Sequence, residues 1–542
     1  MSCLAVSATT GCAGAGLAAE LEPSPRRARV GRARTGARTT ATCTIPAAAA
    51  VLLAAACASP PPPATRIVGA LLVDGTGAAA RAAEVRIRGE RVVAVAPLLE
   101  PLPDEEVIDA AGLVLAPGFI DTHSHHDSGL LAAPAARGAV CQGITTIVVG
   151  QDGDSHWQLR DWFERLEREP PSVNVASYTG HGTLRELAMG DDFRRPATPA
   201  EIADMRALLA ADMTAGSLGL SSGLEYDPGA YATTAELIEL ARVAAWYGGS
   251  YVSHLRSEDR ALFAAIEELV GVGREAGLPV HVSHVKLAMK SLWGRAGDLI
   301  ARLEDARAEG IEVTADVYPY TYWQSTMTVL LPERDFEDRA AAEFALTELA
   351  PPEGIVLARF DAQPEYAGRT LAEVAALRGT DAVTAYLDLI RAARAAGAGE
   401  SIIATSMDPA DVRALAAWPG SSFCSDGSSD GGHPRGHGAF ARVLGRFVRA
   451  EGVLSLEQAV HKMTGLPARQ LGLSERGCVR PGGQADLVLF DPARVIDRAT
   501  VAHPHAAPAG IERVWVNGCV VWDGERATGA RCGAVLRRSV AP

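Results

Sequence analysis

The sequence predicts an α/β protein in which a (β/α)8 barrel is joined to a smaller β-sandwich domain. Three observations support this fold class. The chain has 542 residues, which is too long for one small core but suits a large barrel and a second domain. Residues 117–476 alternate short apolar runs with helical stretches. Residues 66–116 and 477–530 instead carry short strands of alternating polarity.

Residues 1–65 are expected to precede the folded part as a signal segment and a proline-rich linker. A run of arginines without acids is followed by an apolar run, Ile45–Ala56, then by Cys57 and four prolines. This order is typical of a secretory signal, and the segment ending at Cys57 resembles a bacterial lipoprotein signal. The apolar run is too short to cross a membrane as a helix. We therefore expect a periplasmic protein of the bacterial cell envelope, lipid-anchored at Cys57; the alternative is a disordered tail on a cytoplasmic enzyme.

The two flanks of the central region read as strands. Arg66–Gly75 predicts a strand and a turn, and Glu84–Val95 alternates polar and apolar residues around a Gly-Glu turn. Short strand-like segments of this kind return in Ala485–Asp491 and Ile511–Trp522. Each flank is too small to be stable alone, so we expect one sandwich built from both ends of the sequence. Residues 531–542 are predicted to be a tail.

The central region reads as a parallel sheet with helices on its face. Apolar runs predict buried strands, and the longer stretches between them have a helical pattern. The strands are expected at Thr145–Gly150, Tyr251–His254, Val280–His284 and Glu312–Val317, and helices at Thr234–Trp246, Arg260–Ala276 and Ala296–Ala308.

Composition excludes some functions. The formal net charge of −14 argues against an electrostatic grip on nucleic acid. None of the nine cysteines forms a C-x-x-C pair, so a zinc ribbon or a thioredoxin motif is absent. We expect the five cysteines after residue 57 to be buried free thiols rather than disulfides. The expected partner is a small-molecule substrate, with membrane contact only through a lipid anchor.

The strongest chemical signal is the segment Gly118–Asp127, in which apolar residues lead into His123 and His125. Residues two apart on a strand point to the same side, so these two imidazoles can hold one metal ion. The protein has only thirteen histidines, which favours a metal site over a surface loop that happens to be rich in histidine. His126 is expected to lie behind the ligands or to face solvent.

Two more histidines repeat this placement. His254 ends one apolar run and His284 ends another, thirty residues later, with a helix between them. One βα unit brings both to the same face of a barrel, and such barrels keep their active sites at the C-terminal ends of the strands. His281 lies earlier on its strand and is expected to pack.

Two carboxylates follow the same logic. Asp152 and Asp426 each come after a strand-like run and stand beside glycine. Either one alone reads as an Asx turn. Together with the four histidines they predict a nitrogen and oxygen site for zinc or a comparable divalent ion.

Longer motifs contain these residues. They are Gly118–His125, Gly219–Tyr231, Ser253–Glu258, Ser283–Lys286, Asp316–Tyr320, His433–Arg435 and Gly477–Asp491. In this order, from about residue 66 to 525, they resemble the amidohydrolase superfamily, specifically its D-aminoacylase (N-acyl-D-amino-acid deacylase) branch. The resemblance implies a metal-dependent hydrolase that cleaves the amide bond of N-acyl-D-amino acids or related D-configured peptides.

The resemblance also implies how the ligands divide. A tightly held ion would lie at Asp152, His254 and His284, and a weaker one at His123, His125 and Asp426. A divalent ion acidifies its water and polarises the amide carbonyl. Asp426 would take the proton from that water and pass it to the leaving amine.

Recognition of the amino-acid part requires a cation for its carboxylate. Arg435 is the best candidate because guanidinium binds carboxylate through two hydrogen bonds; a structural salt bridge is the alternative. Lys286, Tyr318 and Ser325 resemble the other carboxylate-contacting residues of the family, and Tyr226 is expected to line the pocket. The segment from Tyr318 to Ser325 is one residue longer than the family pattern.

The sequence departs from the family at one ligand. The branch places a cysteine where this protein has Asp152, in a Gly-Asn-Cys-Gly segment that reads Gly150-Gln-Asp-Gly153 here. A carboxylate can hold or bridge ions with its two oxygens. It is a harder ligand than thiolate, so we expect one or two Zn²⁺ ions, with a preference shifted toward Mn²⁺ or Co²⁺.

Two alternatives remain. One is a cyclic-amide hydrolase of the dihydroorotase or hydantoinase kind, although no lysine stands where a carbamate bridge would need it. The other is a non-catalytic metal-binding envelope protein of the same fold, which an intact Asp426 argues against. The side chain preferred in the substrate is left open.

Overall fold

Nine strand segments close into a parallel ring of eight strands in the computed structural model, which describes residues 62–538. Two of the segments, β10 and β11, are halves of one strand interrupted at Tyr178. In ring order the segments are β8 (Phe119–Asp121), β9 (Ile144–Val149), β10 (Asn174–Ser177), β11 (Thr179–Gly180), β12 (Gly219–Gly223), β13 (Ser250–His254), β14 (Val280–Val282), β15 (Val313–Val317) and β19 (Ser421–Phe423).

The first and last strands meet just beyond their ends. The amide of Asp426 donates to the carbonyl of His123 at 2.9 Å, and the amide of His125 donates to the carbonyl of Gly427 at 2.9 Å. Ring closure therefore brings together two segments that lie far apart in the sequence. The strand order and this closing contact agree with the predicted barrel.

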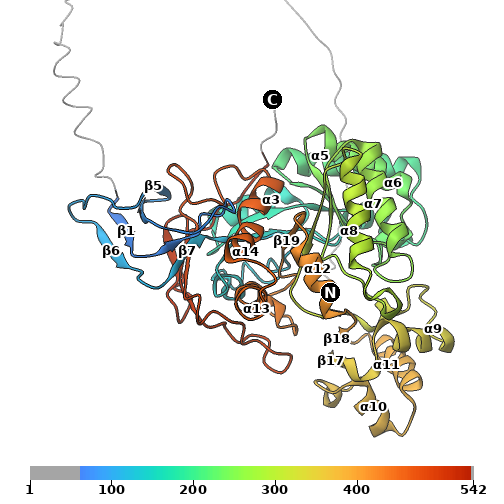
Figure 1. Cartoon of the computed structure of the whole chain (residues 1–542). Helices are drawn as coiled ribbons and strands as arrows, with labels where there is room; N and C mark the ends of the chain where they lie inside the picture. The colour runs from blue at the N-terminus through green and yellow to red at the C-terminus, as the bar shows by residue number, and fades with distance from the viewer. Residues whose placement is uncertain (1–61, 539–542) are drawn as a thin grey trace, which may run out of the picture. The chain divides into compact units, whose positions relative to one another are not determined.

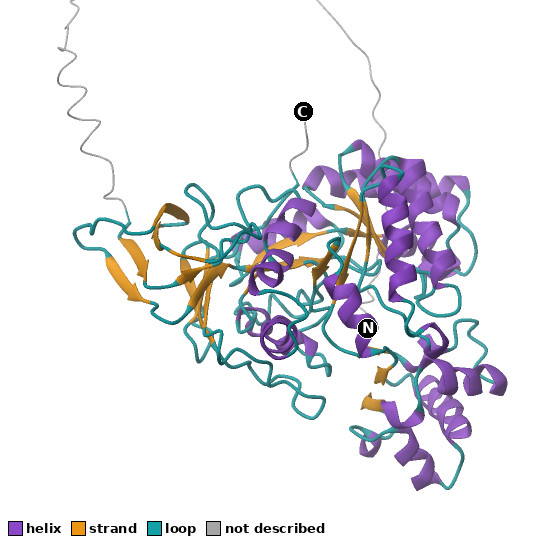
Figure 2. Ribbon diagram, viewed as in Figure 1, coloured by secondary structure: helices purple, strands orange, loops and turns teal. Residues whose placement is uncertain are grey.

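Helices cover the outside of the barrel, whereas the region at the left of Figure 2 is drawn as strands and loops. In Figure 1, α5 to α8 stand side by side along one flank. Their bounds are α5 (Pro199–Ala215), α6 (Thr234–Trp246), α7 (Leu262–Ala276) and α8 (Ala296–Ala308). The predicted helices are confirmed, with α7 starting two residues later than expected. Helix α5 begins at a capping box of Thr198 and Glu201 and ends at Gly216 in a left-handed conformation.

The predicted sandwich of both termini is also confirmed. One sheet has the order β5-β4-β1-β6, and the other has the order β22-β21-β20-β7-β2-β3. The central pairing of the second sheet joins β7 (Val114–Pro117) to β20 (Leu487–Phe490), so the blue N-terminal and red C-terminal segments lie together in Figure 1. Ile67, Val85 and Trp515 belong to the buried apolar cluster of this domain. The other strands are β1 (Ala64–Val68), β2 (Leu71–Leu72), β3 (Arg81–Ala82), β4 (Glu84–Arg88), β5 (Arg91–Ala96), β6 (Glu106–Asp109), β21 (Ile511–Val516) and β22 (Cys519–Trp522).

An insertion between β15 and β19 was not anticipated from the sequence. It contains an antiparallel sheet with the order β16-β18-β17 and three helices. Its Arg334 donates to the carbonyl of Glu225 at 2.8 Å, which ties the insertion to a loop after β12. The elements are β16 (Tyr322–Ser325), α9 (Arg339–Phe344), β17 (Ile355–Phe360), α10 (Leu371–Arg378), α11 (Ala382–Ala396) and β18 (Glu400–Thr405).

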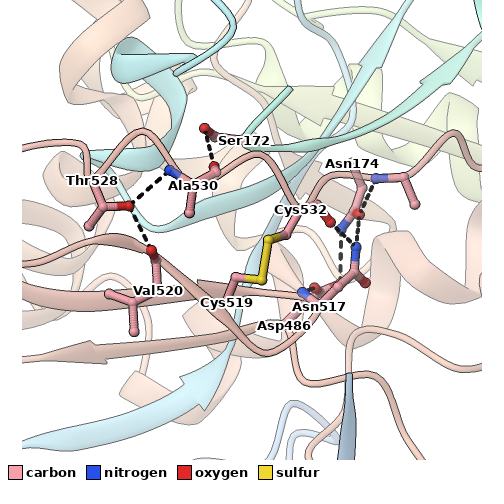
Figure 3. Close-up of a disulfide and its surroundings, with 10 residues drawn as sticks. Ser172, Asn174, Asp486, Asn517, Cys519, Val520, Thr528, Ala530 and Cys532 are labelled. Carbon is pink, nitrogen blue, oxygen red and sulfur yellow. Dashed lines mark hydrogen bonds between the residues drawn. A yellow bond between two sulfur atoms is a disulfide. The ribbon is translucent and has the colours of Figure 1, made fainter. Parts of the chain in front are cut away.

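One cysteine prediction is wrong. Cys519 and Cys532 form a disulfide (Figure 3). Cys141 and Cys424 are buried free thiols as predicted, whereas Cys478 is free but only half-buried. Cys519 begins β22, and the backbone after it turns back beside that strand. Thr528 donates to the carbonyl of Val520 at 2.7 Å, so the two cysteines come together. A one-dimensional pattern of cysteines does not reveal this reversal of direction.

Cys532 lies in a segment that we call the C-terminal strap, residues 528–538. The amide of Val175 on β10 donates to the carbonyl of Ala534 at 2.9 Å, and the amide of Leu536 donates back to Val175 at 2.7 Å. The residues predicted as a tail therefore pair, as far as they are described, with the N-terminal end of a barrel strand. The predicted signal segment and Cys57 lie outside the described residues. No helix within residues 62–538 is long and apolar enough to cross a membrane.

Candidate metal centre

The six candidate ligands lie together at the C-terminal ends of the barrel strands. Three of them have a left-handed backbone: φ is 53° at Asp152, 35° at His284 and 47° at Asp426. Such values are uncommon outside glycine and persist where the surroundings impose them. At His284 the constraint is visible, because its amide donates to a carboxylate oxygen of Asp316 at 2.6 Å. Strand β14 ends at Val282, so His284 lies in the turn after the strand rather than on it.

The first group of ligands is formed by His123, His125, Asp152 and Asp426. Asp152 Oδ2 lies 3.3 Å from His123 Nε2 and 3.4 Å from His125 Nε2. Asp426 Oδ1 lies 3.7 and 3.5 Å from the same two nitrogens. His123 is fully buried, whereas the side chain of His125 is 37% exposed, so the group opens to solvent on the His125 side.

The second group is formed by Asp152, His254 and His284. Asp152 Oδ1 lies 3.3 Å from His284 Nε2 and 4.0 Å from His254 Nδ1. The two ring nitrogens are 3.1 Å apart. Asp152 thus belongs to both groups and turns one oxygen toward each histidine pair.

The donor atoms fit a divalent cation. Within the described residues, neither the ring nitrogens of His123 nor Oδ1 of Asp152 have a hydrogen-bond partner, although all three atoms are buried. Buried polar atoms without partners are rare in proteins. Imidazole nitrogens facing each other around a carboxylate are the ligand chemistry that zinc and similar ions require. A cation in each group would satisfy these atoms.

Asp426 is poised to remain ionised. Arg435 Nη1 lies 2.6 Å from Asp426 Oδ2. Burial alone would raise the pKa of Asp426, but Arg435 and the neighbouring histidines hold that pKa below its ordinary value. The carboxylate therefore keeps Oδ1 free to face His123 and His125 while Arg435 fixes Oδ2.

Two buried cations flank one tyrosine beside the ligands. The Arg435 guanidinium lies 4.8 Å from the centre of the Tyr318 ring, and Lys286 Nζ lies 5.8 Å from it. The Tyr318 hydroxyl is buried and finds no hydrogen-bond partner among the described residues. Two positive groups and a hydroxyl at one place form a suitable environment for a carboxylate.

The other two predicted substrate residues are placed differently. The Tyr226 ring lies 4.5 Å from the ring of His254 and therefore borders the ligands. Ser325 ends β16 in the insertion and pairs with Ile402. No hydrogen bond among the described residues joins Ser325 to the other candidate groups. The segment that is one residue longer than the family pattern is the one that forms β16.

Sequence reasoning missed the acids that lie behind the histidines. Glu225 Oε2 lies 3.1 Å from His254 Nε2, and Glu258 Oε1 lies 3.1 Å from His284 Nδ1. Asp316 accepts from His281 Nε2 at 3.0 Å, which fits the packing role expected for that histidine. These three acids stand inside the motifs that carry the family resemblance, and the sequence pattern gave no signal that they face the ligands.

His126 is buried rather than solvent-facing, which excludes one of its two expected placements. Its Nδ1 lies 3.0 Å from the hydroxyl of Ser429. The ring therefore connects the His123-to-His125 segment to the loop that follows Asp426. It supports the ligands from behind.

The chain is similar to several known proteins along most of its length. The chain matches the Amidohydrolase family over residues 106–346 and 337–522. Over 496 residues it is 39% identical to N-acyl-D-glutamate deacylase of Alcaligenes xylosoxydans xylosoxydans, which covers 87% of this chain and 96% of that protein. It is 41% identical to N-acyl-D-aspartate deacylase of the same organism over 496 residues, covering 87% and 94%. The solved N-acyl-D-glutamate deacylase of Bordetella bronchiseptica, complexed with zinc and a phosphonate inhibitor, has a TM-score of 0.78 and 38% identity, covering 87% of this chain and 99% of that chain.

Proposed function

The chain belongs to the amidohydrolase family and, within it, to the D-aminoacylase branch, and from that premise we propose that it hydrolyses the amide bond of N-acyl-D-amino acids. It is a hydrolase of carbon–nitrogen bonds other than peptide bonds. The observation that carries the proposal is the adjacency of two ligand groups sharing Asp152 to the carboxylate-binding set of Arg435, Lys286 and Tyr318.

The residues divide the reaction between them. Divalent ions held by the two groups would supply Lewis acidity to the amide carbonyl and to water. Arg435, Lys286 and Tyr318 hold the carboxylate of the amino acid and so fix the scissile bond over the ligands. Asp426 Oδ1 takes the proton of the attacking water and then gives it to the leaving nitrogen. Arg435 keeps Asp426 oriented through Oδ2 at 2.6 Å.

A substrate panel tests this proposal. Metal-free protein reloaded with Zn²⁺, Mn²⁺ or Co²⁺ is assayed with N-acetyl-D-glutamate, N-acetyl-D-aspartate, N-acetyl-D-leucine and their L-enantiomers, with dihydroorotate as the cyclic amide. We expect turnover of D-substrates only. Turnover confined to L-substrates or to the cyclic amide would overturn the proposal.

We also propose that Asp152 shifts the metal preference toward harder ions than a thiolate would select. In support, its two oxygens face different histidine pairs at 3.3 Å, and carboxylate is a harder ligand than thiolate. Metal analysis of the protein as isolated, followed by competition between Zn²⁺ and Mn²⁺, tests it. A zinc preference no weaker than that of the Asp152→Cys variant would count against it.

We further propose that the protein works in the cell envelope. Its support is the order of basic and apolar residues before Cys57, and the Cys519–Cys532 disulfide, because disulfides are rare in the cytosol. Fractionation of cells producing the full-length protein and its Cys57→Ala variant tests this. We expect the full-length protein in the membrane fraction and the variant outside it. Recovery of the full-length protein in the cytosol with reduced Cys519 and Cys532 would contradict it.

A further inference from the structure

Each histidine of the second ligand group has a glutamate behind it. His254 turns Nδ1 toward Asp152 and Nε2 toward Glu225, which lies at 3.1 Å. His284 turns Nε2 toward Asp152 and Nδ1 toward Glu258, also at 3.1 Å. A carboxylate on the far nitrogen fixes which nitrogen carries the proton, and so leaves the near one free to bind a cation.

Glu258 also contacts a lysine, which Glu225 does not within the described residues. Its Oε1 also accepts from Lys286 Nζ at 2.5 Å, so one oxygen contacts both a ligand histidine and a cation of the carboxylate-binding set. Lys286 Nζ in turn lies 2.7 Å from His284 Nδ1. Lys286 Nζ and Glu258 Oε1 therefore both lie against His284 Nδ1. If Lys286 donates to Nδ1, that nitrogen cannot carry the ring proton of His284, which then lies on Nε2.

Glu225 provides the comparison. Its Oε2 contacts His254, and its Oε1 accepts from the backbone amide of Glu258 at 3.1 Å. Among the described residues it has no ion pair with lysine or arginine. The loss of Glu225 should therefore affect the metal site without affecting the hold on a substrate carboxylate.

We propose that Glu258 is a positioning residue that couples carboxylate binding at Lys286 to cation binding at His284. Lys286 turns from His284 to the carboxylate when substrate or product binds. The ring proton of His284 then moves from Nε2 to Nδ1 by exchange with solvent, Nδ1–H donates a hydrogen bond to Glu258 Oε1, and His284 Nε2 is free for the cation. This inference rests on the proposed function for the nature of the carboxylate ligand, but not for its effect on the metal site.

The first test measures metal binding without any substrate. Co²⁺ affinity is determined by competition with a chromophoric chelator, and the visible absorption of bound Co²⁺ reports the ligand geometry. We expect Glu258→Ala and Glu225→Ala each to weaken binding by about 10- to 100-fold. Glu258→Gln keeps an acceptor oxygen and should recover most of the loss. Unchanged affinity and spectrum in Glu258→Ala would refute the role at His284.

A matched control is available in another buried pair. Glu236 lies 2.8 Å from His181 Nε2 and is held by Arg185, and neither His181 nor Glu236 forms a hydrogen bond or ion pair with a ligand side chain among the described residues. Glu236→Gln weakens a histidine–glutamate pair of the same kind. It should lower thermal stability and leave the Co²⁺ affinity and spectrum unchanged.

The second test measures the coupling. The probe is D-glutamate, whose binding to the Co²⁺-loaded protein is first established by calorimetry. In the native protein, D-glutamate should tighten Co²⁺ binding, and Co²⁺ should tighten D-glutamate binding by the same factor, because coupling is reciprocal. Glu258→Ala should bring that factor to about one and raise KM, whereas Glu225→Ala should keep the factor and lower kcat alone. An unchanged factor in Glu258→Ala would overturn the coupling.

The two tests keep the proposals apart. If D-glutamate does not bind, the D-amino acid released from the best substrate of the panel takes its place as the probe, and the proposed function fails only if no D-substrate is turned over. The substrate-free cobalt measurement still decides whether Glu258 positions His284.

Discussion

The two ends of the barrel are held in opposite ways. At the C-terminal end, His123 and Asp152 are buried with polar atoms that no described residue satisfies, and three ligands have strained backbones. At the N-terminal end, Asn174 satisfies both ends of its amide: Nδ2 donates to Asp486 at 3.0 Å, and Oδ1 accepts from Asn517 at 2.8 Å. The C-terminal end of the barrel therefore holds polar atoms that are available to a ligand. The N-terminal end holds satisfied hydrogen bonds that stabilise the fold, as barrels of this kind generally do.

The stable end is a junction of three parts of the protein. Asn174 begins β10 of the barrel, and Asp486 and Asn517 belong to the sandwich (Figure 3). The amide of Ala534 in the C-terminal strap donates to Asn174 at 3.0 Å. Substitutions at the metal centre should therefore change kcat far more than the free energy of unfolding. Substitutions at the strap should change the free energy of unfolding and leave kcat unaffected.

The largest expected effect separates the two ends most sharply. Asp426→Asn keeps the size and tolerates the left-handed backbone, but it cannot take a proton. We expect kcat to fall by about 10²- to 10⁴-fold, with a much smaller effect on the thermal unfolding curve, which shifts because buried Arg435 loses its charged partner. Activity with three substrates and unfolding followed by circular dichroism check this. A variant that remains fully active would assign proton transfer to another group.

The second prediction acts on the other end. Removing the disulfide in Cys519→Ser/Cys532→Ser frees a loop with a sequence separation of 13. For a loop of this length, the loss in free energy of unfolding is about 3 kcal/mol. Urea unfolding measures that loss. The kcat of the folded fraction and its Co²⁺ affinity should not change.

Cys478→Ser is the matched control for the disulfide, because Cys478 is a free and partly exposed thiol. This variant should have the same urea midpoint of unfolding as the native protein. A reductant should move the native protein to the midpoint of the double variant and leave that variant where it is. A fall in the kcat of the folded double variant would show that the two ends are not independent.

Sequence reasoning was informative at the C-terminal end because chemistry there depends on rare residue types at fixed places. Histidines and aspartates after apolar runs predicted the ligands His123 and Asp426, and barrel topology then required them to meet. The predicted helix at 234–246 also matches α6, since its apolar spacing reports one buried face.

The rest could not be predicted, because it depends on contacts between segments that have no shared pattern. Glu258 and Lys286 are both ordinary charged residues in motifs, and their 2.5 Å contact exists only after β13 and β14 become neighbours. Residues 531–542 are predicted to be a tail, yet Val535 pairs with Val175, which is far from it in the sequence.

The third prediction returns to the metal centre. Asp152→Cys places a thiolate between the two histidine pairs, and thiolate favours zinc over manganese. We expect the ratio of Zn²⁺ to Mn²⁺ affinity to rise by about tenfold, with a sulfur-to-cobalt charge-transfer band in the Co²⁺ form of the variant only. Asp154→Cys, on the exposed side of the same turn, is the control and should show neither. Equal ratios of Zn²⁺ to Mn²⁺ affinity in the two variants would show that Asp152 is not a metal ligand.

The smallest expected effect tests whether the strap is held by many weak contacts or by the disulfide alone. The Thr528 hydroxyl donates to the carbonyl of Val520 at 2.7 Å and accepts from the amide of Ala530 at 3.2 Å (Figure 3). Thr528→Ala removes both hydrogen bonds and should cost about 1 kcal/mol in free energy of unfolding. Thr528→Ser keeps both and should cost less than half of that. In the background without the disulfide, the cost of Thr528→Ala should shrink, because the strap is then only partly docked. An unchanged cost there, measured by urea unfolding, would mean that the strap docks without its covalent bond and that the disulfide acts on the unfolded state alone.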